Sequence, residues 1–228
     1  SILRQLHLRL GIGGLSTHGK DVENQAGAIQ NLHLEFFFDV AKLLGRRVPV
    51  TLIPQPLLPK GGFALEIYAL DHSSEPKIEE RDGVCYGVIE GEKEKMLFVE
   101  GVPASDFAVS VAEQSHEVFT KLDSILSEYG YGVDDIVRQW NYIGNIVSLR
   151  EGKQNYQEFN DTRTRYYAKG EWSNGYPAAT GIGCSGEGVI IGCIAFRTFP
   201  HQFINRFWMV QIRCGIWIYA LALRTHHM

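Results

Sequence analysis

The segment that decides the fold is residues 107–129, FAVSVAEQSHEVFTKLDSILSEY. Apolar side chains recur in it every three or four residues, which predicts one long amphipathic helix. Those apolar positions are Val111, Val118, Leu122, Ile125 and Leu126. We expect Ser105 and Asp106 to cap the start of the helix, and Gly130 and Gly132 to end it.

Short apolar segments flank this helix on both sides. Before it, residues 84–89 and 95–99 are predicted to pair as two strands around the charged turn EGEKEK. After it, the sequence predicts a strand in IVRQWNYIGNI (136–146), a helix in NYQEFNDTRTRYYA (155–168), and strands at 178–184 and 188–196. The order ββαβαββ is typical of an α+β module.

The amino-terminal part repeats only the later portion of this order. Residues 26–45 predict a helix and residues 63–70 a strand, with a loop rich in proline and glycine between them. The polar segment SSEPKIEERDG (73–83) is predicted to be a boundary between duplicated modules. The predicted division is a partial module over 1–80, a complete module over 81–199 and a divergent apolar tail over 200–228.

Within the tail, residues 203–223 are rich in aromatic and aliphatic side chains. Arg206, Gln211 and Arg213 interrupt this stretch, and its longest apolar run, 214–223, is about half of the ~20 residues that a membrane-spanning helix needs. We therefore expect a buried or interfacial strand, or a tail that did not evolve with the rest, and no membrane partner. No charged region precedes an apolar run at the start, so no signal peptide is predicted.

The composition excludes two classes of protein. With 45% hydrophobic and 21% charged residues, the 228-residue chain is too apolar to be disordered, and its net charge of −4 does not suit a nucleic-acid binder. The spacing of its cysteines (Cys85, Cys184, Cys193 and Cys214) fits no zinc site, and the eight histidines form no ligand pattern. We expect reduced thiols in the cytoplasm and no metal.

Five sequence blocks resemble one known family. They are FVEGVPA (98–104), QSHEVFTKLDSILSEYGYGVDDIVRQWNYI (114–143), YQEFNDTRTRYY (156–167), YPAATGIGC (176–184) and GVIIGCIAF (188–196). Block by block they resemble the reactive-intermediate deaminase (Rid, YjgF-like) family, over about residues 84–196. The resemblance implies an α+β fold of the chorismate-mutase-like type, in tandem modules with a mixed β-sheet and helices packed on one face. It also implies a homo-oligomer or pseudo-trimer with ligand clefts between modules.

A narrower resemblance comes from RQWNYI, the FN-x-x-R helix and PAATGIG, which together are similar to the chorismatases. These hydrolases of secondary metabolism cleave the enolpyruvyl ether of chorismate. They release pyruvate and either a dihydroxycyclohexadiene carboxylate or a hydroxybenzoate. The resemblance implies a small-molecule substrate, chorismate or a related carboxylate, and no cofactor.

The sequence departs from both families at positions that matter for catalysis. Rid deaminases have a carboxylate-binding arginine where this chain has Ala179, and their acidic residue falls near Gly192, or near Tyr68 in the first unit. An imine deaminase that lacks both groups is disfavoured. Chorismatases carry their catalytic glutamate in a further carboxyl-terminal portion, whereas this chain stops resembling them after Phe196 and has no acidic residue beyond Glu187. The catalytic acid is therefore unknown, and a truncated, inactive chain or a non-catalytic binding or assembly module is the alternative.

Two arginines are the predicted substrate clamps. Chorismate has two carboxylates, and a guanidinium group binds a carboxylate bidentately. Arg138 and Arg163 are the candidates, and Asn160 shares a helix face with Arg163. The alternative for Arg163, and more so for Arg165, is an ordinary solvated helix surface.

Further candidates lie on the two strands and the second helix. Trp140 and Tyr142 alternate with Asn141 on a strand, so they share a face, either as a wall of the substrate cleft or as core; Asn141 needs a polar partner. Tyr156 is predicted to donate a hydrogen bond to a carboxylate or to hold the helix in place. The backbone amides of Thr180 and Gly181 are predicted to bind an anion, unless the glycines there reflect tight packing.

Overall fold

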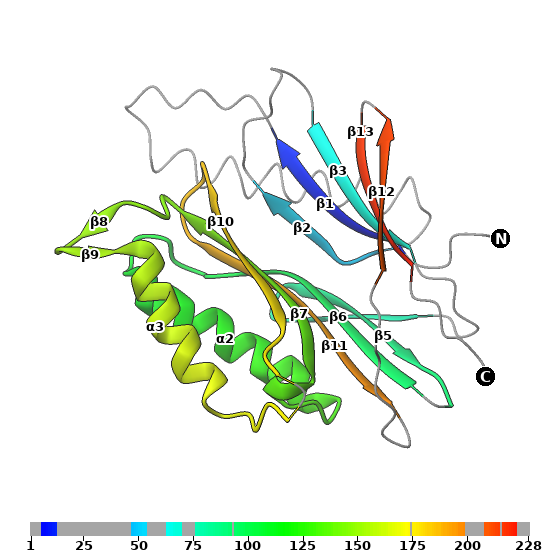
Figure 1. Ribbon diagram of the computed structural model, residues 1–228. Helices are drawn as coiled ribbons and strands as arrows, with labels where there is room; N and C mark the ends of the chain where they lie inside the picture. The colour runs from blue at the N-terminus through cyan, green and yellow to red at the C-terminus, as the bar shows by residue number, and fades with distance from the viewer. Residues whose placement is uncertain are drawn as a thin grey trace.

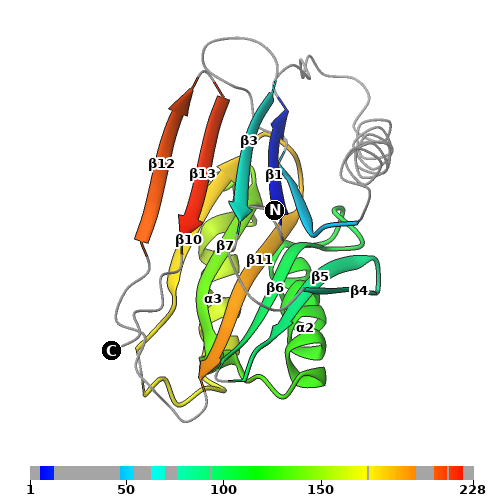
Figure 2. The ribbon, with the colours of Figure 1, turned by 90° about the vertical axis from the view of Figure 1, so that its right-hand side faces the viewer.

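The computed structural model of the chain describes residues 6–12, 47–53, 63–69, 76–92, 94–173, 175–198, 208–214 and 216–222, and side chains within 47–53, 76–92, 94–173 and 175–198. Three layers are visible in Figure 1. Two helices cover one face of a central six-stranded sheet, and further strands lie beyond its other face. Figure 2, turned by 90°, shows the same order of layers.

The central sheet has the strand order β10-β7-β11-β6-β5-β4, and β10 runs parallel to β7 while the other neighbours are antiparallel. Its strands are β4 (Lys77–Arg81), β5 (Val84–Glu90), β6 (Glu94–Pro103), β7 (Ile136–Gly144), β10 (Ala178–Cys184) and β11 (Val189–Thr198). The helices are α2 (Val111–Glu128) and α3 (Asn155–Tyr167). The predicted ββαβαββ order and the mixed sheet with helices on one face are therefore confirmed.

The smaller elements connect or flank this unit. They are a 3-10 turn η1 (Val133–Asp135), a short hairpin of β8 (Leu149–Arg150) and β9 (Lys153–Gln154), a three-stranded sheet in the order β2-β1-β3, and an antiparallel pair β12-β13. The bounds of the flanking strands are β1 Leu6–Ile12, β2 Val50–Ile53, β3 Phe63–Ala69, β12 Trp208–Cys214 and β13 Ile216–Ala222. The strand predicted at 63–70 is confirmed, and the tail contains strands, as predicted; the helix predicted at 26–45 lies outside the described residues. No helix among the described residues is long and apolar enough to cross a bilayer.

The polar segment 73–83, predicted to be a boundary between modules, contains a strand. This strand, β4, pairs antiparallel with β5 through a tight turn at Asp82 and Gly83, both with positive φ. Charged side chains suit an edge strand, because they face solvent and discourage pairing with another chain. The polar composition of the segment is therefore that of a protected sheet edge.

The start of α2 was also predicted wrongly. The cap is Ser110, not Ser105 or Asp106, and Ser110 and Glu113 form a reciprocal capping box: the Ser110 hydroxyl accepts from the Glu113 amide, and the Glu113 carboxylate accepts from the Ser110 amide. Ser105 instead donates its amide to Glu117. The end of the helix is as predicted, since Gly130 takes the positive φ of 73° that ends a helix at little steric cost.

Each face of the sheet has its own apolar cluster. The larger cluster lies between the sheet and the helices, where Phe119 of α2 stacks with Tyr166 of α3 at a centroid distance of 4.6 Å. The smaller cluster lies on the opposite face, which we call the open-layer face, and its buried members are Ile89, Met96, Phe98, Trp140, Tyr142, Cys184 and Ile194. The helices therefore cover one face of the sheet, while β2 contacts the open-layer face.

Candidate functional site

The alternation of β7 divides the predicted site residues between the two faces of the sheet. Trp140 and Tyr142 belong to the cluster on the open-layer face, whereas Asn141 between them points toward the helices. The parallel register pairs Arg138 with Ala178 and Trp140 with Thr180, so Arg138 and Thr180 lie on the open-layer face as well. Tyr156, Asn160 and Arg163 are on α3, on the other side.

On the open-layer face, Arg138 is the group that can bind an anion. Its guanidinium lies 4.8 Å from the centre of the Trp140 ring, and its Nη2 donates to Thr180 Oγ1 at 3.3 Å. Both Arg138 and Thr180 are half-buried, while Trp140 and Tyr142 are buried in the apolar cluster. The two aromatic side chains are thus core residues, the packing alternative left open by the sequence, and they form the floor on which Arg138 rests.

A buried carboxylate on the same face was missed from the sequence. Glu100 of β6 is 3% exposed, and its Oε2 accepts a hydrogen bond from the hydroxyl of Thr51 in β2. A Cβ atom at Gly192 would lie only 2.8 Å from this oxygen, so the carboxylate occupies the space above the glycine. Gly192 is the neighbour of Trp140 across the sheet. Glu100 therefore lies at the position where the Rid resemblance expects the family's acid, although it comes from another strand.

The backbone beside Glu100 is shaped to admit β2. Gly101 has a φ of 61°, and a Cβ atom there would lie 2.5 Å from the carbonyl oxygen of Val50. Only glycine accepts both this conformation and this close approach without strain. The sequence signal for a buried carboxylate was the Glu-Gly pair within the apolar run MLFVEGVP (96–103). Thr51, the hydrogen-bond partner of Glu100, is about fifty positions away and could not be inferred.

The second group of predicted residues forms a stripe along α3. Tyr156, Asn160 and Arg163 are spaced by four and three residues, which places them on one side of the helix. The Arg163 guanidinium lies 5.7 Å from the Phe159 ring centre and 5.9 Å from that of Tyr167. Among the described residues it has no carboxylate partner, and Asn160 Oδ1 is buried without a hydrogen-bond donor. We call these three residues the α3 stripe.

Under the stripe runs a chain of buried hydrogen bonds. The Tyr167 hydroxyl donates to Gln139 Oε1 at 2.7 Å, Gln139 Nε2 donates to Asn141 Oδ1 at 2.6 Å, and Asn141 Nδ2 donates to the carbonyl of Thr180 at 2.9 Å. Asn141 thus has the polar partner that its strand position demanded. Burial raises the pKa of the Tyr167 hydroxyl, against the effect of nearby Arg163, so this group stays a neutral donor.

The glycines of β10 serve packing. A Cβ atom at Gly181 would lie 2.9 Å from Cε2 of Tyr156, and one at Gly183 would lie 2.6 Å from Cγ2 of Ile146. Tyr156 therefore rests on Gly181 and holds α3 against the edge of the sheet. This geometry supports the packing alternative for the glycines; binding of an anion by the amides of Thr180 and Gly181 stays a prediction.

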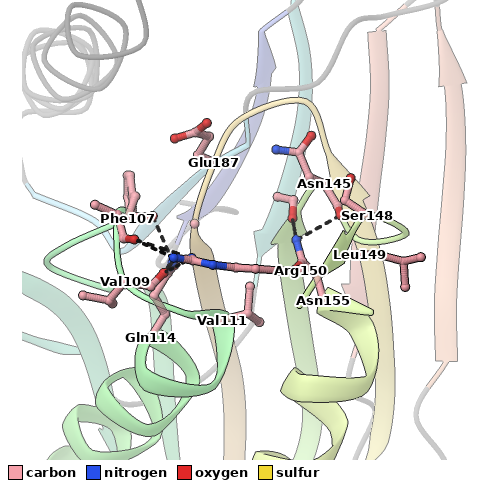
Figure 3. Close-up of a pocket in the computed structure, with 13 residues that line it drawn as sticks. Phe107, Val109, Val111, Gln114, Asn145, Ser148, Leu149, Arg150, Asn155 and Glu187 are labelled. Atoms are coloured by element: carbon pink, nitrogen blue, oxygen red, sulfur yellow. Dashed lines mark hydrogen bonds between the residues drawn. The ribbon is translucent and has the colours of Figure 1, made fainter. Parts of the chain in front are cut away.

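A cavity of about 420 Å³ lies at the start of α2 and contains none of the predicted site residues (Figure 3). Arg150 enters it and donates from Nη1 to the carbonyl of Val109 at 3.1 Å, while Asn155 Nδ2 donates to the carbonyl of Asn145 at 3.1 Å. These polar groups connect loops on either side of the cavity. They are thereby engaged in structural hydrogen bonds.

Among the side chains that the structure describes there is neither a metal site nor a reactive thiol. No group of three or more potential ligands occurs within that part of the chain. Cys85, Cys184 and Cys193 are buried free thiols, and burial raises the pKa of Cys85 and of Cys184 to about 11. A thiol with such a pKa is largely protonated at neutral pH and is a weak nucleophile.

A family model described as the amino-terminal region of FkbO/Hyg5-like chorismatases matches residues 73–195, more than half of the chain. The chain belongs to this chorismatase family. The match covers both helices and the central sheet up to Ala195 of β11, and so includes Arg138, Trp140 and the α3 stripe.

Three individual proteins are similar to parts of the chain. A 3-hydroxybenzoate synthase from Streptomyces hygroscopicus is 30% identical over 164 residues, which are 66% of this chain and 46% of that protein. A chorismatase crystal structure matches with a TM-score of 0.51 and 16% identity, over 85% of this chain and 49% of that one. A YjgF/YER057c/UK114 family member from Mycobacterium tuberculosis matches with a TM-score of 0.36 and 17% identity, over 45% of this chain and 79% of its own.

The chorismatase-family chain thus spans about half the length of the first two relatives. The structural match to the chorismatase shows the fold, which is α+β and Rid-like. The two arginines predicted to bind one substrate lie on opposite faces of the sheet, Arg138 against Trp140 on the open-layer face and Arg163 against Phe159 on α3. We therefore treat Arg138 and Arg163 as parts of two separate candidate sites.

Proposed function

We propose that the open-layer face binds chorismate or a closely related carboxylate and that the chain cleaves its enolpyruvyl ether. The products would be pyruvate and a dihydroxycyclohexadiene carboxylate or a hydroxybenzoate. Family membership supports this proposal, as does the 3-hydroxybenzoate synthase relative. The observation that carries it is the buried Glu100 on the same face as Arg138 and Trp140.

The chemistry assigns a role to each of these groups. Cleavage of a vinyl ether begins with a proton added to the terminal methylene by a general acid. Glu100 would supply that proton, and water would then attack the resulting oxocarbenium carbon and return a proton to the carboxylate. The hemiketal then breaks its bond to the ring oxygen, which takes up the proton of the hemiketal hydroxyl, so that pyruvate and the dihydroxycyclohexadiene carboxylate are released; loss of water from this carboxylate would give a hydroxybenzoate. The hydroxyl of Thr51, which donates to Glu100, holds the carboxylate in place.

Substrate orientation would come from the other end of the face. Arg138 and Thr180 are half-buried at the side where the site is accessible, and a guanidinium binds a carboxylate through two parallel hydrogen bonds. Trp140, buried beneath Arg138, would hold the guanidinium in place. No step in this scheme requires a cofactor, because protonation and hydration are acid–base reactions.

The test is pyruvate release from chorismate by the purified chain. We expect Glu100→Gln to lower the rate at least 100-fold, since a carboxamide has no proton to give, and Arg138→Ala to raise KM. Glu171→Gln, at an exposed glutamate, is the matched control and should leave the rate unchanged. Equal rates for Glu100→Gln and Glu171→Gln, in proteins with equal thermal unfolding, would reject Glu100 as the acid.

The α3 stripe supports a second function, the binding of a small carboxylate without turnover. Its support is the Arg163 guanidinium, which has two aromatic rings against it but no carboxylate partner in the described chain, next to the unsatisfied Asn160. A carboxylate would pair with Arg163, and a hydroxyl on the same ligand would donate to Asn160 Oδ1. This ligand would lie beside Tyr156.

Binding measurements separate the two functions. We expect Arg163→Ala to weaken chorismate binding at least about tenfold, because a charged hydrogen bond contributes roughly 1.5–3 kcal/mol. Arg165→Ala is the control, since Arg165 is exposed on the same helix and donates to Thr162. Calorimetric titration that gives one dissociation constant for both variants would rule out the α3 stripe as the binding site.

A further inference from the structure

Two amide side chains lie on the helix side of β7, among apolar neighbours. Gln139 and Asn141 are both 0% exposed, and they share this side of the strand with Ile143 of the larger apolar cluster. A buried pair of hydrogen-bonded amides gives little net stability over apolar side chains of the same shape. Packing therefore does not require amides at these two positions, and their hydrogen bonds indicate another role.

The hydrogen bonds of the two amides run in one direction. The Tyr167 hydroxyl donates to Gln139 Oε1, so Nε2 of Gln139 is turned toward Asn141 and donates to its Oδ1 at 2.6 Å. With Oδ1 engaged as an acceptor, Asn141 Nδ2 is turned toward the carbonyl of Thr180, to which it donates at 2.9 Å. Each side chain thus fixes the orientation of the next amide, and the series ends on β10.

Strand β10 is an edge strand, so it is held from one side. Within the described chain its ladder pairs it with β7 alone. Ala178, Ala179 and Gly181 beside Thr180 are exposed and small, so their side chains add little packing. The bond from Asn141 is a side-chain tie in addition to the ladder, and it acts directly on the backbone of Thr180.

Thr180 connects this series of bonds to the open-layer face. Its carbonyl accepts from Asn141, while its Oγ1 accepts from Arg138 Nη2 at 3.3 Å. This distance is at the long end of the hydrogen-bond range, so a small shift of Thr180 would break the contact. The Thr180 hydroxyl and the Trp140 ring, 4.8 Å away, both act on the orientation of the Arg138 guanidinium.

We propose that Asn141 is a positioning residue for substrate binding: it holds Thr180 in place, and Thr180 orients Arg138 toward the substrate carboxylate. This role rests on the proposed function, in which Arg138 binds that carboxylate. The hydroxyl that donates to Glu100 comes from Thr51 of β2 and is separate from this series. Loss of the Asn141 amide should therefore weaken substrate binding and leave proton transfer largely unchanged.

The kinetics of pyruvate release from chorismate test this role. We expect Asn141→Leu, which has a similar shape but no donor, to raise KM at least fivefold and to change kcat less than twofold. Gln114→Leu is the matched control and should leave KM unchanged, because Gln114 is also buried but donates to the carbonyls of Phe107 and Val109 before α2. A fall in kcat with KM unchanged, or equal shifts in KM for both variants, overturns the proposal.

A double-mutant cycle shows whether Asn141 acts through Thr180. Thr180→Val removes the hydroxyl that contacts Arg138 but keeps the backbone carbonyl, so it should raise KM by itself. In the Thr180→Val background, Asn141→Leu should raise KM less than twofold further, because the group that Asn141 positions is gone. Effects that multiply in the double variant would show that Asn141 acts on packing alone, and would reject the proposal.

A milder variant keeps the test decisive if Asn141→Leu does not fold. Tyr167→Phe removes only the hydroxyl that orients Gln139, the first bond of the series. We expect it to raise KM at least twofold with kcat unchanged. A folded Tyr167→Phe variant with the KM of the unmodified chain overturns the proposal.

Arg138 can also be followed without chorismate. Phenylglyoxal modifies accessible guanidinium groups, and peptide mass spectrometry measures the rate at Arg138. Asn141→Leu and Thr180→Val should each speed this modification at least twofold, because both release the guanidinium, whereas Gln114→Leu should not. An unchanged rate in folded Asn141→Leu rejects the positioning role. Faster modification in a chain that releases no pyruvate rejects the proposed function instead, so the two proposals fail separately.

Discussion

The two helices on the sheet begin in different ways. In α2, the Ser110–Glu113 capping box and the hydrogen bond that the Ser105 amide donates to Glu117 join the helix to the loop before it. In α3, the first helical residue follows Gln154, whose side chain makes no capping bond. Each helix has a side-chain oxygen buried without a donor, Gln114 Oε1 in α2 and Asn160 Oδ1 in α3, and Asn160 shares its side of the helix with the Arg163 guanidinium, which makes α3 the candidate for a ligand.

The largest expected effect is on the free energy of unfolding, and we compare one residue from each helix. Leu122 of α2 is 0% exposed, and its replacement by alanine should lower the free energy of unfolding by about 2–5 kcal/mol through lost burial and a residual cavity. Tyr156 of α3 is 37% exposed and packs on Gly181, so Tyr156→Ala should cost less, about 1–2 kcal/mol. Urea denaturation at neutral pH measures both. Equal losses would show that α3 is as structural as α2, and the contrast between the helices would be wrong.

The fold could be predicted because it depends on local patterns. Apolar periodicity predicted the helix at 107–129, and short apolar segments predicted the strands on either side of it. Two uses of polar residues were not predicted: β4, within the module boundary expected at 73–83, and Ser110, which caps a helix that was expected to begin at 107. In each case the polar composition was recognised, but the structure that it forms was not predicted.

The site could be predicted only in part, because a sequence does not say which face of a sheet a residue occupies. Alternation correctly grouped Trp140 with Tyr142 and separated Asn141, but it could not reveal that Arg138 and Arg163 end on opposite faces. Glu100 was missed because its environment is made by Thr51, which lies far away along the chain. Such contacts follow from tertiary packing and leave no local pattern.

A smaller effect is expected from pH. Burial opposes ionisation of Glu117, but hydrogen bonds from Lys121 and Ser105 outweigh burial and lower its pKa to about 2. Because the folded-state pKa is below the ordinary value of about 4.3, Glu117 stabilises the fold above that value, and the contribution disappears as pH falls toward 2. After allowance for solvent screening we expect about 1 kcal/mol.

The variant Glu117→Gln isolates this contribution. Its free energy of unfolding should be lower than that of the unmodified chain at pH 7, and the difference should shrink between pH 5 and pH 2. Urea denaturation at several pH values gives the two curves. A difference that persists unchanged at pH 2 would show that the carboxylate charge plays no part in holding the loop to α2.

The smallest effect, and the one that separates the helices most directly, is expected from two asparagines of α3. Asn160→Leu removes the amide whose Oδ1 is buried without a donor, so the free energy of unfolding should stay the same or rise by up to about 1 kcal/mol. Asn155→Leu is the matched change. Asn155 Nδ2 donates to the carbonyls of Asn145 and Gly144, so this variant should lose about 1 kcal/mol.

Chorismate binding gives the second readout for the same pair. If the α3 stripe is kept for a ligand, Asn160→Leu should bind chorismate at least threefold more weakly while being no less stable. Asn155→Leu, whose bonds lie within the fold, should keep its affinity at temperatures where it remains folded. A loss of stability in Asn160→Leu equal to that in Asn155→Leu would mean that the Asn160 amide is structural. The polar groups of α3 would then be no different in kind from those of α2.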